Sequence, residues 1–341
     1  MKCVKTQDAV GHVLCHDITQ IIKDVKKGTA FRKGHIVTEE DIPVLLSLGK
    51  DNLYIWEKTE GILHENEAAE YLRDICMNEN MIQSEVKEGK IELIAEIDGL
   101  LKIDVDKLRA VNSLGEMMIA TRHTNTTVKK GDKLVGTRII PLLIEQEKME
   151  KAKEVAGDRP ILSLIPFKKK KVGIVTTGNE VFYGRIKDTF GPVVAEKVKE
   201  FGADVIGQTI VNDDIEKITK AVEEFIEQGA DMVLCTGGMS VDPDDKTPGA
   251  IKATGARIVS YGAPVLPGAM FLLSYLEDGT PVMGLPGCVM YAKATVFDLV
   301  LPRIAAGIEV TKKDLAHMGN GGFCLGCKEC HYPNCSFGKG V

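Results

Sequence analysis

Apolar segments of strand length alternate with amphipathic segments over residues 172 to 307, and this alternation constrains the fold more than any other feature. Val172–Val175, Asp204–Ile210 and Asp231–Cys235 each have the length and character of a buried strand. Apolar side chains recur at helical spacing between the last two, at Ile215, Ile218, Val222, Phe225 and Ile226. Strands that alternate with such helices are typical of βαβ units in a parallel sheet covered on both faces. We therefore predict an α/β fold with a doubly wound, mostly parallel sheet.

The rest of the chain divides into smaller regions. We predict a small α+β, β-rich domain over residues 1–58 and an α+β middle domain over 59–155, ahead of the α/β domain at 170–307. A cysteine-rich tail follows at 318–341. The whole chain has 341 residues, of which 44% are hydrophobic, and this is enough to bury a core in each of two or three domains.

Composition excludes several classes of protein. The net charge of −6 excludes nucleic-acid binding driven by bulk charge, which needs a basic surface. Polar residues near Met1 interrupt any signal peptide, and the most apolar stretch, Ala263–Leu276, is too short and too rich in proline to span a bilayer. The nine cysteines do not form the dense pattern of a secreted disulfide scaffold. We expect a cytoplasmic protein with no membrane or nucleic-acid partner.

Two glycine-containing loops follow predicted strands. They are Thr177-Gly178-Asn179-Glu180 and Thr236-Gly237-Gly238-Met239-Ser240. Ligands of open parallel sheets bind beyond the carboxyl ends of the strands, and glycines let backbone N–H groups approach an anion closely. Thr247 is expected to cap a helix whose first residue is Pro248, and that helix start would also favour a phosphate. Neither a Walker nor a Rossmann glycine pattern is present.

Three carboxylates stand beside this predicted anion site, at Asp242, Asp244 and Asp245. They would repel an anion unless a cation lay between them, and Mg²⁺ prefers a few carboxylates together with substrate oxygens. We predict a magnesium site at Asp242 and Asp245. The alternative is an acidic turn in which Asp242 and Asp244 only cap backbone N–H groups.

These residues resemble the molybdopterin-binding domain of molybdenum cofactor biosynthesis. The two glycine loops, Asp188-Thr189, and Asp245 with Thr247-Pro248 match that family over roughly 170 to 307. Pro267-Gly268 and the loop Gly284-Leu285-Pro286-Gly287 resemble its molybdopterin molybdenumtransferase branch. The resemblance implies that the substrate-binding residues are Thr177, Gly178, Asn179, Glu180, Thr236, Gly237, Gly238, Ser240, Thr247, Pro267, Gly268, Pro286, Gly287 and Cys288.

The resemblance also implies a chemistry. Family members bind the dithiolene pterin phosphate, and they either adenylate it with ATP or insert molybdate into the adenylate and release AMP. Asp188 and Asp245 are the catalytic candidates, with Mg²⁺ as cofactor and molybdopterin or its adenylate, with molybdate or tungstate, as substrates. A homo-oligomer is expected, with a molybdoenzyme or a redox protein as a candidate partner.

The sequence departs from the branch at two positions. Ala269 replaces the usual lysine after Pro-Gly, and Cys288 replaces the usual asparagine after Gly-Leu-Pro-Gly. An alternative function is therefore a carrier or sensor that binds the finished cofactor without turnover, and a third is a pure interaction module. Cys288 itself is either a reactive thiolate at a helix N-terminus or a buried cysteine that packs as a small apolar side chain.

Four cysteines crowd the tail, at Cys324, Cys327, Cys330 and Cys335. Thiolates at this spacing fit either an iron–sulfur cluster or a tetrahedral Zn²⁺, in which His331 can replace one sulfur. A disordered tail with labile thiols is the alternative. The surrounding glycines predict that the tail forms no packed core by itself and lies apart from the pterin site as a contact element.

Overall fold

The computed structural model describes residues 2–22, 26–55 and 60–340. They form two compact units, which are described separately. The first unit spans Met1–Glu96, Ile103–Arg122 and Gly131–Ser163, and the second spans Ile97–Lys102, His123–Lys130 and Leu164–Val341. Within the described residues, no helix is both long and apolar enough to cross a membrane.

The N-terminal part of the first unit is an α+β arrangement with a small core. Its elements are β1 (Lys2–Lys5), η1 (Thr6–Asp8), β2 (Ile18–Ile22), β3 (Lys26–Phe31), α1 (Asp41–Ser47) and β4 (Asn52–Ile55). Strands β1 and β4 pair antiparallel, as do β2 and β3. Leu14, Leu45 and Leu53 are buried together beneath them. The domain boundary predicted at residue 58 lies outside the described residues.

The remainder of the first unit contains three helices and a four-stranded antiparallel sheet of order β6-β7-β11-β9. The elements are β5 (Ile62–His64), α2 (Glu65–Cys76), β6 (Met81–Gln83), β7 (Lys90–Ala95), α3 (Val105–Asn112), β9 (Met117–Thr121), β11 (Lys133–Ile139), β12 (Leu143–Glu145) and α4 (Gln146–Ala156). A three-stranded sheet of order β10-β8-β13, most of whose residues belong to the second unit, joins β8 (Gly99–Ile103), β10 (Thr126–Val128) and β13 (Leu162–Pro166).

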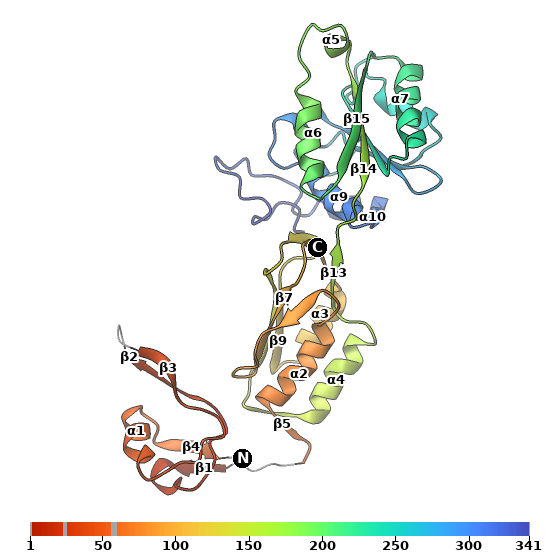
Figure 1. The fold of residues 1–341 in the computed structure, drawn as a ribbon. Helices are drawn as coiled ribbons and strands as arrows, with labels where there is room; N and C mark the ends of the chain where they lie inside the picture. Colours follow the sequence, from red (N-terminus) through yellow and green to blue (C-terminus); the bar gives the residue numbers. More distant parts are fainter. Residues whose placement is uncertain (1, 23–25, 56–59, 341) are drawn as a thin grey trace. The chain divides into compact units, whose positions relative to one another are not determined.

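A six-stranded sheet of order β15-β14-β16-β19-β18-β17 forms the centre of the second unit (Figure 1). The strands are β14 (Lys171–Thr177), β15 (Asp204–Val211), β16 (Met232–Thr236), β17 (Arg257–Tyr261), β18 (Leu272–Tyr275) and β19 (Pro281–Leu285). The helices are α5 (Asn179–Phe182), α6 (Phe190–Lys199), α7 (Ile215–Glu227), α8 (Thr247–Ala253), α9 (Val296–Ala305) and α10 (Lys312–His317), with the 3₁₀ turn η2 (Gly287–Met290).

This sheet is mixed, so the predicted α/β class is confirmed but a doubly wound, mostly parallel sheet is not. Strands β15, β14, β16 and β19 are mutually parallel, whereas β18 runs antiparallel to both β19 and β17. The reason lies in the connections. Residues 262–271 and 276–280 join β17 to β18 and β18 to β19 without a helix. Such short connections allow only an antiparallel return.

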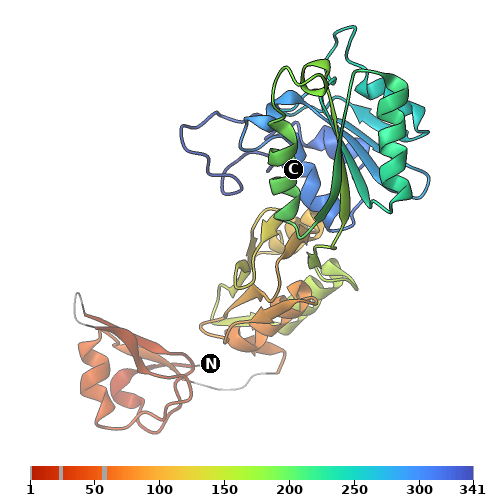
Figure 2. The ribbon, with the colours of Figure 1, turned by 45° about the horizontal axis from the view of Figure 1, so that its top comes forward.

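Helices cover both faces of the sheet. Val198 of α6 and Phe297 of α9 share one core with Ile174 and Leu234 of the central strands. Side chains of α7 and α8 form a second core on the opposite face, with Val175, Val233 and Cys235 of the same strands. Figures 1 and 2 show α6 and α7 on opposite sides of β14 and β15. Successive strand residues thus point to alternate faces, and both faces are buried, which explains the continuously apolar strand sequences.

The C-terminal tail packs against the core of this unit, and its predicted role as a contact element apart from the pterin site stays a prediction. Leu315, Met318 and Phe337 are each no more than 3% exposed and belong to the same core as α9. The Tyr332 hydroxyl donates a hydrogen bond of 2.9 Å to the backbone carbonyl of Asp298 in α9. The glycines of the tail therefore did not prevent packing, because an existing core supplies the apolar surface that the tail lacks.

Candidate functional site

The loops singled out in the sequence meet at one edge of the six-stranded sheet. Strands β14, β16 and β19 are parallel, so the loops at 177–180, 236–240 and 286–288 all follow carboxyl ends on the same side. Strand β18 runs the other way, and its first residue, Leu272, pairs with Gly284 near the end of β19. The loop with Pro267 and Gly268, which precedes β18, therefore lies at this edge too. In Figure 1, α5 marks the edge beyond the end of β14.

Two threonine hydroxyls join three of these segments. The Thr247 hydroxyl donates to the carbonyl of Gly237 at 2.8 Å and lies 3.2 Å from the Thr177 hydroxyl. Both threonines are buried. Gly237 has φ +85°, and a Cβ there would lie 2.2 Å from the Thr177 carbonyl oxygen. Only glycine fits this crossing, so the paired glycines of the sequence are required by the backbone conformation as well as suited to a ligand.

The Thr247 contact corrects a prediction. Lys246, rather than Thr247, is the N-cap of α8, so Thr247 and Pro248 are the first two helical residues. Lys246 makes no side-chain cap. The Thr247 hydroxyl is directed to the glycine loop instead of to its own helix.

Asp188 lies at the start of α6, where it acts as a structural acceptor. Its carboxylate accepts the backbone N–H of Phe190 at 2.9 Å and the side-chain amide of Gln208 at 2.6 Å. The same amide nitrogen of Gln208 lies 2.8 Å from the hydroxyl of Thr176. These contacts connect Asp188 to the ends of β14 and β15. Sequence reasoning missed Gln208, since no pattern marks a lone glutamine in a strand.

The acidic loop after β16 folds into a turn that Asp245 closes. The Asp245 carboxylate accepts the backbone N–H of Asp242 at 2.9 Å, and the Asp245 N–H donates back to the Asp242 carbonyl at 2.9 Å. The capping role considered for Asp242 and Asp244 is therefore played by Asp245. The side chains of Asp242 and Asp244 are exposed beside it.

Asp213 adds a carboxylate that the sequence did not indicate. It accepts the backbone N–H of Asn179 at 2.9 Å. Burial raises the pKa of the Asp213 carboxyl, and the nearby negative charges of Glu180, Asp244 and Asp245 raise this pKa further. The loops after β14, β15 and β16 thus bring a group of acids together, and their mutual repulsion would be relieved by a bound cation.

Tyr261 is a second residue that sequence reasoning missed. Its hydroxyl lies 3.0 Å from the carbonyl of Met239 and 3.1 Å from that of Ser240. Burial raises the pKa of Tyr261, and the charge of Asp245 raises it further. The end of β17 therefore supports the predicted substrate loop from the opposite side.

The environment of Cys288 disfavours a reactive thiolate. It lies in η2, and the long helix α9 begins only at Val296. Burial raises the pKa of the Cys288 thiol, and the charge of Asp298 acts in the same direction. The raised pKa disfavours a thiolate, but the side chain is only half-buried, so both interpretations of Cys288 stay open.

The predicted metal sites are not confirmed. Within the described part of the chain, no three or more His, Cys, Asp or Glu side chains are arranged to hold a metal ion. This applies to the magnesium site at Asp242 and Asp245 and to the iron–sulfur or zinc site at the four tail cysteines. Asp242 and Asp245 share the backbone turn described above, and Cys327 and Cys330 are exposed.

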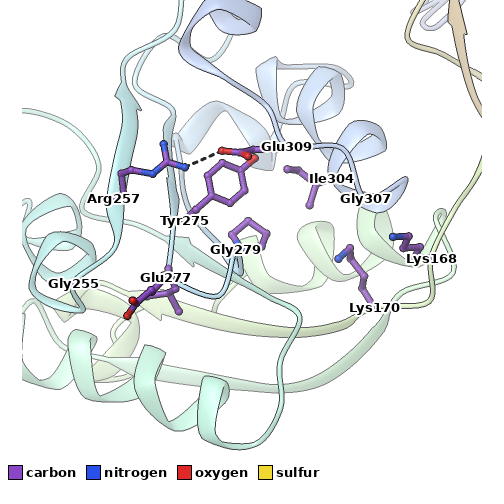
Figure 3. A pocket seen from close by; sticks show the side chains of 12 residues that line it. Lys168, Lys170, Gly255, Arg257, Tyr275, Glu277, Gly279, Ile304, Gly307 and Glu309 are labelled. Atoms are coloured by element: carbon purple, nitrogen blue, oxygen red, sulfur yellow. Dashed lines mark hydrogen bonds and ion pairs between the residues drawn. The ribbon is translucent and has the colours of Figure 1, made fainter.

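A different cavity, of about 830 Å³, lies at the other end of the sheet. Its lining includes Lys170, which directly precedes β14, and Arg257, the first residue of β17. Figure 3 shows Arg257 directed toward Glu309, with which it forms an ion pair of 2.8 Å. None of the predicted ligand residues lines this cavity, so size alone does not identify the candidate site.

Comparison with protein families gives two matches. Residues 173–306 match the model described as "Probable molybdopterin binding domain". Residues 3–57 match a domain of unknown function.

Two similar proteins match parts of the chain. A molybdopterin molybdenumtransferase of Synechococcus elongatus is 25% identical over 196 residues, which cover 54% of this chain and 46% of that protein. A CinA-like protein of Mycobacterium tuberculosis is 36% identical over 77 residues, or 23% of this chain and 18% of that protein. The chain thus spans less than half of the length of each of these relatives.

The solved structures that are similar to the chain include two whose names mention molybdopterin or molybdenum cofactor biosynthesis. The molybdopterin biosynthesis enzyme MoaB of Thermus thermophilus is 22% identical, covers 40% of this chain and 97% of its own, and gives a TM-score of 0.34. A molybdenum cofactor biosynthesis protein of Pyrococcus furiosus is 17% identical, covers 91% of this chain and 66% of its own, and gives a TM-score of 0.26. These scores are too low to support an inference about function.

Proposed function

We propose that this chain binds molybdopterin or its adenylate and acts in molybdenum cofactor biosynthesis. The proposal rests on residues 173–306, which match the family of probable molybdopterin-binding domains. The ligand would lie at the edge of the six-stranded sheet where these loops meet. We propose further that the bound adenylate receives molybdate in a magnesium-dependent reaction that releases AMP. Tungstate is an alternative oxyanion with the same geometry.

The observation that carries the binding proposal is the contact among Thr177, Gly237 and Thr247. The buried hydroxyls hold the glycine loop against the end of β14 and the start of α8. Gly237 and Gly238 both have positive φ, a backbone conformation that glycine adopts without strain. A phosphate at such a loop can accept several N–H groups at once.

Magnesium fits the chemistry of the acids at this edge. Glu180, Asp213, Asp244 and Asp245 are close enough for their charges to raise the pKa of Asp213. Mg²⁺ is usually held by one or two carboxylates together with substrate phosphates, and seldom by a complete protein cage. Asp242 and Asp245 would hold it here, so three protein ligands are not needed. When bound, the ion would neutralise charge on the phosphoanhydride.

The two catalytic candidates would have different tasks. Asp245 is near the acids and Tyr261, and its carboxylate would orient the phosphate end of the substrate. Asp188 is occupied by the N–H groups of α6 and by Gln208. It would therefore act by positioning α6 and the neighbouring strand ends.

A carrier or sensor is the second candidate function. Ala269 stands where a lysine is usual in the transferase branch, and Cys288 stands where an asparagine is usual. The raised pKa of Cys288 gives no replacement for the missing cation. Both substitutions leave pterin binding possible and weaken the argument for turnover.

The experiment that separates the two functions measures AMP. The full chain is incubated anaerobically with adenylated molybdopterin, Mg²⁺ and molybdate. The proposed transferase releases AMP only when molybdate is present. Bound pterin without AMP release, and without consumption of ATP when molybdopterin is offered, would establish the carrier instead.

A further inference from the structure

The tail is held against the second unit by backbone contacts next to a predicted ligand loop. Leu266 donates its N–H to Gly322 at 2.8 Å and accepts the N–H of Cys324 at 2.8 Å. Leu266 and Phe323 form a parallel bridge. Leu266 directly precedes Pro267 and Gly268 of the candidate site. The start of the tail is therefore fixed in place rather than free.

All four tail cysteines line one cavity of about 270 Å³, together with His331. The opposite wall is formed by Pro267 and residues 292–294. The four thiols are free. Cysteines that are scattered along twelve residues of sequence are thus gathered around one space on the surface of the α/β domain.

The four thiols differ in how firmly they are held. Cys324 and Cys335 pack against the apolar core that includes Phe337. Cys327 and Cys330 are exposed, on a span whose Leu325 is 73% exposed. Cys324 and Cys335 are thus anchored, and Cys327 and Cys330 lie on the exposed span between them. This span can close over the cavity with little change to the core.

We propose that this cavity is the binding site of a thiolate-held metal centre, with Cys324, Cys327, Cys330 and Cys335 as its ligands. Four thiolates are the ligand set of both Zn²⁺ and iron–sulfur clusters. The described residues include no group of three such ligands that could hold a metal ion, so the proposal requires the exposed span with Cys327 and Cys330 to move inward when the metal binds. Each thiol loses a proton as it becomes a ligand, and the metal replaces the exposed conformation of the span with a closed one.

The first experiment measures metal binding by the full chain, without any pterin. The protein is purified anaerobically, stripped with a chelator and reduced. It is then offered Zn²⁺ in one arm and, in the other, Fe³⁺ with sulfide and excess thiol, which supplies the electrons that reduce part of the iron. We expect one zinc ion or one cluster per chain. The arm with the tighter binding identifies the metal, and sulfur-to-iron absorption confirms a cluster in the iron arm.

Variants test the ligands. Cys327→Ser and Cys330→Ser change exposed residues, so both proteins are expected to fold normally. Each should weaken metal binding at least ~100-fold, since the loss of even an outer partner costs about 10- to 100-fold. Cys3→Ser changes an exposed cysteine far along the sequence and should have no effect.

Two results would overturn the proposal. One is the absence of stoichiometric binding in both arms. The other is binding that Cys327→Ser and Cys330→Ser leave unchanged. The pair His331→Ala and Cys335→Ser distinguishes the ligand sets. If His331→Ala loses metal binding and Cys335→Ser keeps it, the fourth ligand is His331 and Cys335 is not a ligand. None of these measurements depends on the pterin, so a failure of the proposed function would leave their outcome unaffected.

Discussion

The Thr177 hydroxyl lies 3.2 Å from the Thr247 hydroxyl, and this contact joins the end of β14 to the first residue of α8 across the glycine loop. The two residues are 70 positions apart in the sequence. Their contact shows why the glycine loop, the acidic loop and the helix start act as one structural group.

Thr247→Val should weaken both the fold and ligand binding. The valine keeps the shape but leaves the Gly237 carbonyl without its donor at a buried position. A buried group left unsatisfied costs about 1–3 kcal/mol. Urea unfolding measures the stability, and a pterin titration measures the binding. Thr254→Val, at the other end of the same helix, is the matched control and should leave pterin affinity unchanged.

Asp245→Asn should abolish molybdate-dependent AMP release and leave pterin binding within a few-fold of wild type. The asparagine oxygen can still accept the Asp242 N–H, so the turn is kept while the charge is lost. AMP release and pterin affinity are measured on the same preparation. Asp278→Asn, in the turn before β19, is the control. Unchanged AMP release in Asp245→Asn would remove this residue from the proposed chemistry.

The contribution of Asp213 to the free energy of unfolding should decrease as the pH rises. Its pKa is raised in the folded protein, so the folded state binds a proton that the unfolded state has already released. Its stabilising contribution is complete below the unfolded pKa of about 4 and is lost as the pH rises through the folded pKa. Urea unfolding from about pH 4 to pH 7 should show this decline in wild type and a smaller decline in Asp213→Asn. Identical slopes in the two proteins would contradict the assignment.

Cys288 should react slowly with an alkylating agent. Burial raises the pKa of its thiol, and only the thiolate is a good nucleophile. Mass spectrometry of the protein after brief exposure to iodoacetamide near neutral pH should find Cys3 modified well before Cys288. Preferential labelling of Cys288 would favour the interpretation as a reactive thiolate.

Phe337→Ala should destabilise the second unit, because the tail is part of its core. Phe337 is 3% exposed, and truncation of a buried phenylalanine costs about 3–5 kcal/mol. Phe323→Ala is the matched control, since Phe323 is 68% exposed and should change stability by no more than about 0.5 kcal/mol. Equal stability of the two variants would show that the tail does not pack in solution.

The sequence predicted the α/β unit well where local pattern and global fold agree. The strands β14 and β16 and the helix α7 follow from hydrophobic pattern, because their apolar residues are buried in the cores of this unit. Strand β15 was also predicted, although only Val211 of its residues is buried. The antiparallel strand β18 was missed as such, since strand direction depends on the connections and leaves no mark on the strand itself. The loops at the sheet edge could be predicted because paired glycines indicate a loop and Thr-Pro indicates a helix start from the local sequence alone.

The features that the sequence could not predict depend on tertiary contacts. Asp213 and Gln208 matter through neighbours far along the chain, and a lone residue of either type carries no pattern. The pKa of Cys288 depends on burial, which outweighs the effect expected from a helix start. The tail was predicted to form no packed core by itself because of its glycines, and the α9 core that receives Phe337 is not visible in the composition of the tail.

The most direct test of the central claim is an anaerobic titration of the full chain with molybdopterin, followed by pterin fluorescence in the presence and absence of Mg²⁺. We predict saturable binding to one site per chain, tighter with Mg²⁺, and its loss in Gly237→Ala, where a Cβ would lie 2.2 Å from the Thr177 carbonyl oxygen. Circular dichroism and Thr254→Val control for folding. Absence of binding by well-folded wild-type protein under reducing conditions would contradict the account.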